Sequence, residues 1–179
     1  MFQEWLINQP LLDFFSAGIE GESIVVGIPY DPIHKWDEFS PWVNNQMYRW
    51  MNPYDANRIE GGDGAAYLEF LLNTLKPNID GRYRSLQDQE NTFIGGYDMG
   101  GLISLYAGLT RPDVFSLVMI MSPAVWFAED EDHWLSRNRL IDLINISGIS
   151  KDVTFFINMA VEDRTTDLVV RPVIYDSQG

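Results

Sequence analysis

The sequence predicts an α/β fold, with a mostly parallel sheet and helices on both of its faces. Short β-branched runs alternate along the chain with stretches whose apolar residues recur at helical spacing. A glycine-rich segment, residues 95–101, joins one such run to one such stretch, which is typical of a strand, a sharp turn and a helix. The chain has 179 residues, of which 46% are hydrophobic, enough for one buried core. We therefore expect residues 1–179 to form a single domain.

The predicted strands are short apolar runs bounded by turn residues. Four of them predict buried parallel strands, at residues 23–28, 92–95, 116–121 and 153–159. Residues 168–175 predict a fifth strand. Pro172 favours the edge of the sheet for it, because proline cannot donate a hydrogen bond to a neighbouring strand.

Helical spacing of apolar residues predicts the helices between these strands. The predicted helices cover residues 2–18, where Pro10 interrupts the spacing, then residues 63–77 with Asp63 as the cap, 100–109, and 129–146 with an acidic first turn. Residues 29–62 are rich in proline, asparagine and tryptophan, and predict a long loop. Long ordered loops are often functional, so this one is a candidate pocket wall.

Composition excludes several classes of function. The formal net charge of −14 repels phosphate backbones, so we expect no nucleic-acid partner. No apolar run approaches the length that spans a membrane, and no leader opens the chain, so we expect a cytoplasmic protein. The chain has no cysteine, and consecutive acids such as those of residues 129–133 point in different directions on a helix. We therefore expect no metal and no cofactor.

The segment Gly96-Tyr97-Asp98-Met99-Gly100 matches the nucleophile elbow G-x-S-x-G, except that a carboxylate replaces the serine. An apolar run precedes it and a helical stretch follows it, which is the context in which an elbow presents its central residue. The segment therefore predicts the elbow architecture and puts a serine mechanism in doubt.

Several ordered motifs together resemble the putative esterase family of α/β-hydrolases, which includes enterochelin esterases, S-formylglutathione hydrolases and feruloyl esterases. They span roughly residues 20–165 and are more specific together than an elbow alone. Besides the elbow they comprise residues 24–28, 38–42, 61–71, 75–80, 83–84, 111–115 and 122–127. The resemblance implies an α/β-hydrolase-like fold and a lineage of carboxylic-ester hydrolysis through an acyl-enzyme.

The resemblance also implies the site residues. Asp98 stands at the nucleophile position, and the backbone N–H of Met99 would be one oxyanion donor. The triad acid corresponds to Asp163 or its neighbour Glu162, and the family's histidine follows the acid. No histidine follows residue 133 in this chain, so we expect a catalytically impaired esterase.

The amino-terminal part of the family's fold is shortened here. The family places a further central strand between the runs at 23–28 and 92–95, and omitting it would expose unpaired backbone groups on two strands. Either the sheet closes in a rearranged way, using residues 168–175, or the chain is a fragment of a longer protein, incomplete relative to the full fold. We expect the fragment, whose open sheet edge would favour a homo-oligomer.

Two other functions stay open. Asp98 could be a carboxylate nucleophile, as in dehalogenases and epoxide hydrolases, although hydrolysis of the resulting ester needs a base. Alternatively, the chain is a non-catalytic ligand-binding module that uses the loop at 29–62. His34, Trp36 and Trp42 are the pocket candidates of that loop. The expected partner is a small-molecule ester or none.

Overall fold

The computed structural model describes residues 23–44, 59–128, 139–162 and 168–175, with only the backbone from residue 159 onward. The chain divides into two compact units, Met1–Ile33 and His34–Gly179. Each unit is described by itself. Among the described residues, no helix is long and apolar enough to cross a membrane.

In the first unit, the predicted strand at residues 23–28 is wrong. The chain from residue 23 to residue 31 has no regular secondary structure, and Ile24, Val25 and Val26 are 48%, 46% and 41% exposed. β-Branched residues favour an extended backbone, but a strand forms only where its N–H and C=O groups meet a partner strand. Among the described residues this run pairs with none.

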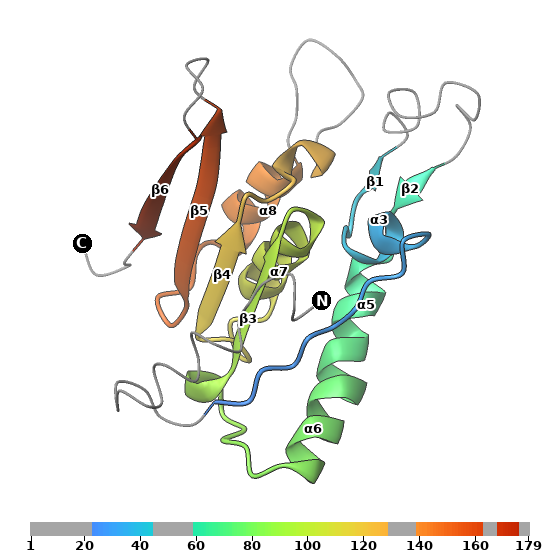
Figure 1. Cartoon of the computed structure of the whole chain (residues 1–179), viewed down its shortest axis with the longest axis vertical. Coiled ribbons are helices and arrows are strands. Elements are labelled where there is room, and N and C mark those ends of the chain that lie inside the picture. Colours follow the sequence, from blue (N-terminus) through green and yellow to red (C-terminus); the bar gives the residue numbers. More distant parts are fainter. Residues whose placement is uncertain (1–22, 45–58, 129–138, 163–167, 176–179) are drawn as a thin grey trace. The chain divides into compact units, whose positions relative to one another are not determined.

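The second unit contains a four-stranded sheet in the order β3-β4-β5-β6 (Figure 1). Its strands are β3 (Phe93–Tyr97), β4 (Leu117–Met121), β5 (Thr154–Glu162) and β6 (Leu168–Tyr175). The first three run parallel, with Gly95 opposite Met119 and Met119 opposite Phe156. The strands predicted at residues 92–95, 116–121 and 153–159 are confirmed, and so is the mostly parallel sheet.

The strand at residues 168–175 lies at the edge of the sheet, as Pro172 predicts. β6 runs antiparallel to β5, with Pro172 opposite Asn158. It therefore stands at the edge opposite to β3, so the alternative in which this strand closes the gap beside β3 is wrong. Within the described residues, β3 pairs with β4 alone.

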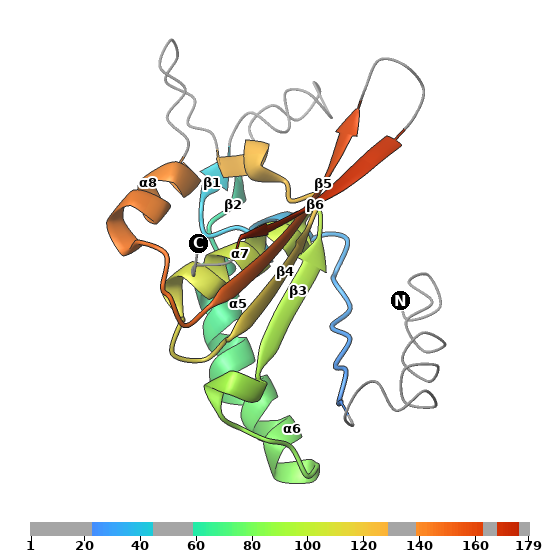
Figure 2. The ribbon, with the colours of Figure 1, turned by 90° about the vertical axis from the view of Figure 1, so that its left-hand side faces the viewer.

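Two helices of this unit, α7 (Met99–Thr110) and α8 (Arg139–Ser147), lie on one side of the sheet (Figure 2). A Cβ atom added to Gly108 of α7 would lie 2.4 Å from the Val118 side chain, so the helix packs very closely on β4. The core between these layers holds the fully buried side chains of Val118 and Ile120. The helices predicted at 100–109 and 129–146 are confirmed where they are described; residues 129–138 lie outside the described residues.

The other face of the sheet carries exposed apolar side chains. Phe93, Tyr97 and Met119 are 55%, 58% and 42% exposed. They alternate with partly buried positions in β3 and with buried positions in β4. The helix predicted at residues 2–18 lies outside the described residues. Helices are therefore described on one of the two faces for which they are predicted.

The helix predicted to end at Pro77 continues beyond it. α5 (Gly64–Phe70) passes through a π-helical turn (Leu71–Leu75) into α6 (Lys76–Arg82). The N–H of Lys76 donates to the carbonyl of Leu71, a bond across five residues that closes the π turn just before the proline. Proline is tolerated in a first turn, because its missing N–H would have no acceptor within the helix there. Asp63 precedes α5, but its side chain makes no capping hydrogen bond.

The predicted loop at residues 29–62 contains short regular elements. They are α3 (Lys35–Glu38) and a two-stranded antiparallel pair formed by β1 (Val43–Asn44) and β2 (Glu60–Gly61). Two residues fasten this segment. The Asp37 carboxylate accepts a hydrogen bond from the Gly61 N–H at 2.9 Å, and the buried Ser40 carbonyl accepts from the N–H groups of Gly62 and Gly64.

Candidate active site

The strand, sharp turn and helix predicted around residues 95–101 are present as β3, Asp98 and α7. Asp98 has φ 57° and ψ −121°, a backbone conformation that residues with a side chain rarely adopt. Its N–H donates to the Met121 carbonyl at 3.1 Å. Its own carbonyl accepts from the N–H groups of Leu102 and Ala124, each at 3.1 Å. These bonds from α7 and from the segment after β4 hold Asp98 in its strained conformation.

The two glycines that flank Asp98 in the motif differ in what they contribute. A Cβ atom on Gly96 would lie 2.3 Å from the carbonyl carbon and oxygen of Gly100, so only glycine fits there. A Cβ atom on Gly100 would have no heavy atom within 4 Å. The turn therefore requires Gly96 for close backbone approach, while Gly100 satisfies the sequence motif without a steric demand.

The carboxylate of Asp98 is half-buried at the amino-terminal end of α7. It makes no capping hydrogen bond to the helix. Within the part of the chain that the structure describes, no side chain donates a hydrogen bond to it and no cation pairs with it. Met99 follows with its side chain 2% exposed and its N–H in the first turn, where a helix offers no internal acceptor. A carboxylate here benefits from the positive end of the helix dipole.

The Asp98 backbone conformation predicts a measurable strain. We expect Asp98→Gly to have a free energy of unfolding about 1 kcal/mol higher than Asp98→Ala, because glycine adopts positive φ without steric cost. Both variants remove the carboxylate, so their difference isolates the backbone term. Urea unfolding of the two variants measures it, and equal stabilities would contradict a strained elbow.

Of the two predicted triad acids, only Glu162 lies within the described residues, and there only its backbone is described. Glu162 is the last residue of β5, and Asn158 of the same strand is opposite Met121 at the end of β4. Glu162 thus lies four residues further along the strand, roughly 13 Å at the usual rise per residue. Asp163 lies outside the described residues, so its role stays a prediction.

The histidines add no base to this arrangement in the described residues. His34 is exposed and directly precedes α3, where its carbonyl accepts from the Glu38 N–H at 2.9 Å. His133 lies outside the described residues. No group of three or more histidine or acidic side chains able to hold a metal ion occurs among the described residues.

Of the three predicted pocket residues, Trp36 lies in the apolar cluster that includes Met99. Its ring stacks on Phe127, with centroids 5.9 Å apart and planes 11° apart. Trp126, which is 46% exposed, lies 6.3 Å from Trp36 and edge-on to Phe127. Trp42 packs edge-on against Tyr106 at 6.0 Å, so it anchors the loop to the core.

Sequence reasoning missed Trp126 and Phe127 as members of this site. Both belong to the motif at residues 122–127, but nothing local marks them as partners of a tryptophan ninety residues earlier. They form a short 3₁₀ turn (Val125–Ala128), in which Phe127 is fully buried and its carbonyl accepts from the Asn44 side chain at 3.0 Å. The motif's position after β4, next to the elbow strand, is the signal that could have indicated them.

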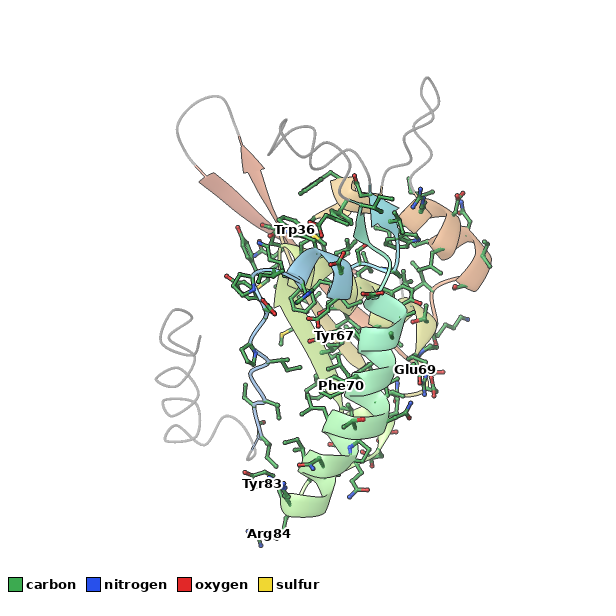
Figure 3. All side chains as sticks on the ribbon, turned by 90° about the vertical axis from the view of Figure 1, so that its right-hand side faces the viewer. Trp36, Tyr67, Glu69, Phe70, Tyr83 and Arg84 are labelled. Atoms are coloured by element: carbon green, nitrogen blue, oxygen red, sulfur yellow. The ribbon has the colours of Figure 1, made fainter. Side chains whose placement is uncertain are left out.

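The segment around α3 is also acidic. Asp37 and Glu38 follow Trp36, and Glu38 contributes to the electrostatics of Tyr67 on α5. Burial, and secondarily the charge of Glu38, raises the pKa of Tyr67 to about 12. The Tyr67 ring packs on Phe39 at 5.1 Å. Figure 3 shows Trp36 beside the end of α5 that carries Tyr67, and Tyr83 and Arg84 at the far end of α6.

The parallel strands and the elbow between strand and helix define an α/β-hydrolase-like protein. Comparison with known sequences gives the family: the profile named Putative esterase matches residues 2–169, and the chain belongs to this family.

Two relatives are just over a quarter identical to the chain across the aligned residues. Ferri-bacillibactin esterase BesA of Bacillus subtilis strain 168 is 26% identical over 169 residues, covering 88% of this chain and 57% of the relative. The uncharacterized protein YbbA of the same organism is 27% identical over 106 residues, covering 59% of this chain and 39% of the relative. The chain therefore spans about two fifths to three fifths of the length of these relatives.

Among solved structures, the BES protein of Bacillus cereus is similar to this chain with a TM-score of 0.50 and 18% identity. The similarity covers 72% of this chain and 43% of that structure. At this identity the likeness shows the fold, in agreement with the parallel sheet described above.

Proposed function

We propose that this chain is a member of the esterase lineage that has lost serine-type catalysis. Asp98 in the strained elbow conformation is the observation that carries the proposal. The elbow exists to present a nucleophilic oxygen, and here it presents a carboxylate. A serine mechanism requires a hydroxyl at this position, and an aspartate supplies none. The nucleophile of the acyl-enzyme mechanism is thus replaced.

The names of the relatives supply an ester class for this lineage. BesA is named as an esterase of ferri-bacillibactin. A further relative, from Aspergillus fumigatus, is named as a siderophore triacetylfusarinine C esterase. We extend these names to the chain as a proposal: its lineage acted on siderophore esters.

The proposal predicts the outcome of an ester-hydrolysis assay. With p-nitrophenyl acetate, we expect the unmodified chain and Asp98→Asn to release p-nitrophenol at the same rate, equal to the buffer background. Asp98→Asn is the matched control, because it keeps the shape of the side chain and removes its charge. Turnover at an enzyme-like rate that Asp98→Asn abolishes would overturn the proposal.

A second candidate is an aspartate-nucleophile hydrolase, favoured by the absence of described side-chain partners around the Asp98 carboxylate. In that reaction a carboxylate oxygen attacks an alkyl carbon, the halide or the opened epoxide oxygen leaves, and an alkyl-enzyme ester forms. This candidate predicts a covalent adduct on Asp98 after incubation with haloalkanes or epoxides, detected by mass spectrometry of the intact chain and its peptides. Unlabelled Asp98 across a panel of such compounds rejects it, and Asp98→Asn controls for labelling elsewhere.

A further inference from the structure

The aromatic cluster next to the elbow, formed by Trp36, Trp126 and Phe127, has a half-exposed surface. Phe127 is fully buried and supports the Trp36 ring from within the unit. Trp126 is 46% exposed although its ring contacts both of the other rings. A large indole ring that is held in place and partly exposed is a preformed contact surface. The side chain is already ordered, so a ligand that binds to it loses little of its binding free energy to conformational entropy.

This cluster already holds an ammonium group from its own chain. The Nζ atom of Lys35 lies 4.2 Å from the centroid of the Trp36 ring. A cation within about 6 Å of an indole centroid is attracted by the negative face of the ring. The Trp36 ring is therefore oriented so that a positive charge can reach it.

The elbow adds negative charge close to the cluster. Met99, adjacent to Asp98, lies in the same apolar cluster as Phe127, with Trp36 packed against it. The Asp98 carbonyl is hydrogen-bonded to Ala124, two residues before Trp126. The exchange of the family's serine for Asp98 thus replaces a neutral hydroxyl by a carboxylate on the residue that directly precedes Met99 of this cluster. Together with a formal net charge of −14, this favours cations and repels anions.

We propose that this surface binds an organic cation, with an alkylammonium or quaternary ammonium group seated on the indoles of Trp36 and Trp126 and the Asp98 carboxylate as the counter-charge. The inference goes beyond the loss of esterase activity and is independent of it, since binding requires no turnover. Lys35 acts as an internal competitor for the Trp36 ring, and an incoming ammonium displaces it.

Titration calorimetry with choline at constant ionic strength tests the proposal. We expect saturable binding of choline and none of its neutral isostere 3,3-dimethylbutan-1-ol. Trp126→Leu and Asp98→Asn should each weaken choline binding at least about fivefold. Tyr83→Leu is the matched control, because Tyr83 is an aromatic residue of similar exposure at the far end of α6 from Trp36, and it should bind choline like the unmodified chain (Figure 3).

Lys35→Met gives the sharpest outcome, since it removes the competing ammonium and keeps an unbranched side chain. We expect it to tighten choline binding about two- to fivefold. The proposal is overturned if neither the unmodified chain nor Lys35→Met binds choline, if the neutral isostere binds equally well, or if an aromatic anion such as benzoate binds in preference. Thermal unfolding of each variant establishes that it is folded. If Trp126→Leu does not fold, the choline affinities of Lys35→Met and Asp98→Asn decide the test.

Discussion

Gly96→Ala is expected to lower the free energy of unfolding by about 3 kcal/mol or more, the largest effect of any single methyl group at the elbow. The added Cβ atom would lie 2.3 Å from the carbonyl carbon and oxygen of Gly100. Backbone atoms in the first turn of α7 cannot rotate away as a flexible side chain would. Relief of the clash therefore requires α7 to move away from β3, and with it the elbow that positions Asp98.

Gly100→Ala is the matched control for this prediction. Its Cβ atom would meet no heavy atom within 4 Å, and the residue is helical. Because alanine is the better helix former, we expect it to be neutral or to stabilise the protein by about 0.5–1 kcal/mol. Denaturant unfolding of the two variants gives the comparison. If both glycines tolerate alanine equally, the close approach of β3 and α7 at the elbow is wrong.

Phe127→Ala is expected to lower the free energy of unfolding by about 3–5 kcal/mol, the usual range for a fully buried phenylalanine. Phe127 is 0% exposed and is the ring on which Trp36 stacks. Its removal leaves a cavity under α3 and detaches Trp36 from the cluster that includes Met99. We therefore expect the tryptophan fluorescence of the folded variant to shift towards that of solvent-exposed indole.

The adjacent Trp126→Ala serves as the comparison. Trp126 is the larger side chain but is 46% exposed, so we expect a loss of about 1 kcal/mol or less. Urea unfolding and fluorescence spectra of both variants show whether the loss of stability follows the burial of the ring or its size. A loss for Trp126→Ala that equals that for Phe127→Ala would contradict the packing described for the 3₁₀ turn.

The sequence predicted correctly those strands whose neighbouring strands in the sheet are also marked by apolar runs in the sequence. The three parallel strands and the edge strand at 168–175 are confirmed. Each is an apolar run that forms backbone hydrogen bonds with another such run. The run at 23–28 has the same composition, yet it forms no strand among the described residues. Propensity favours an extended chain, but only a hydrogen-bonding neighbour makes a strand of it.

The helix at residues 64–82 also shows where local sequence rules fail, here by predicting an end that the helix does not have. Proline predicts a stop at residue 77, since it cannot donate to the preceding turn. The π-helical turn at Leu71–Leu75 shifts the hydrogen-bond pairing just before Pro77, which stands at the start of α6. No local composition rule encodes such a shift in pairing.

For the candidate site, the sequence by itself determined the chemistry that is present. It placed a carboxylate rather than a serine hydroxyl at the elbow, and this is a fact of residue identity. Tertiary structure alone decided the surroundings of that carboxylate. It put Asp98 at φ 57°, fixed Gly96 rather than Gly100 as the glycine the turn requires, and stacked Trp36 on Phe127. These contacts join residues far apart in the chain, and only packing of the folded backbone brings such residues together.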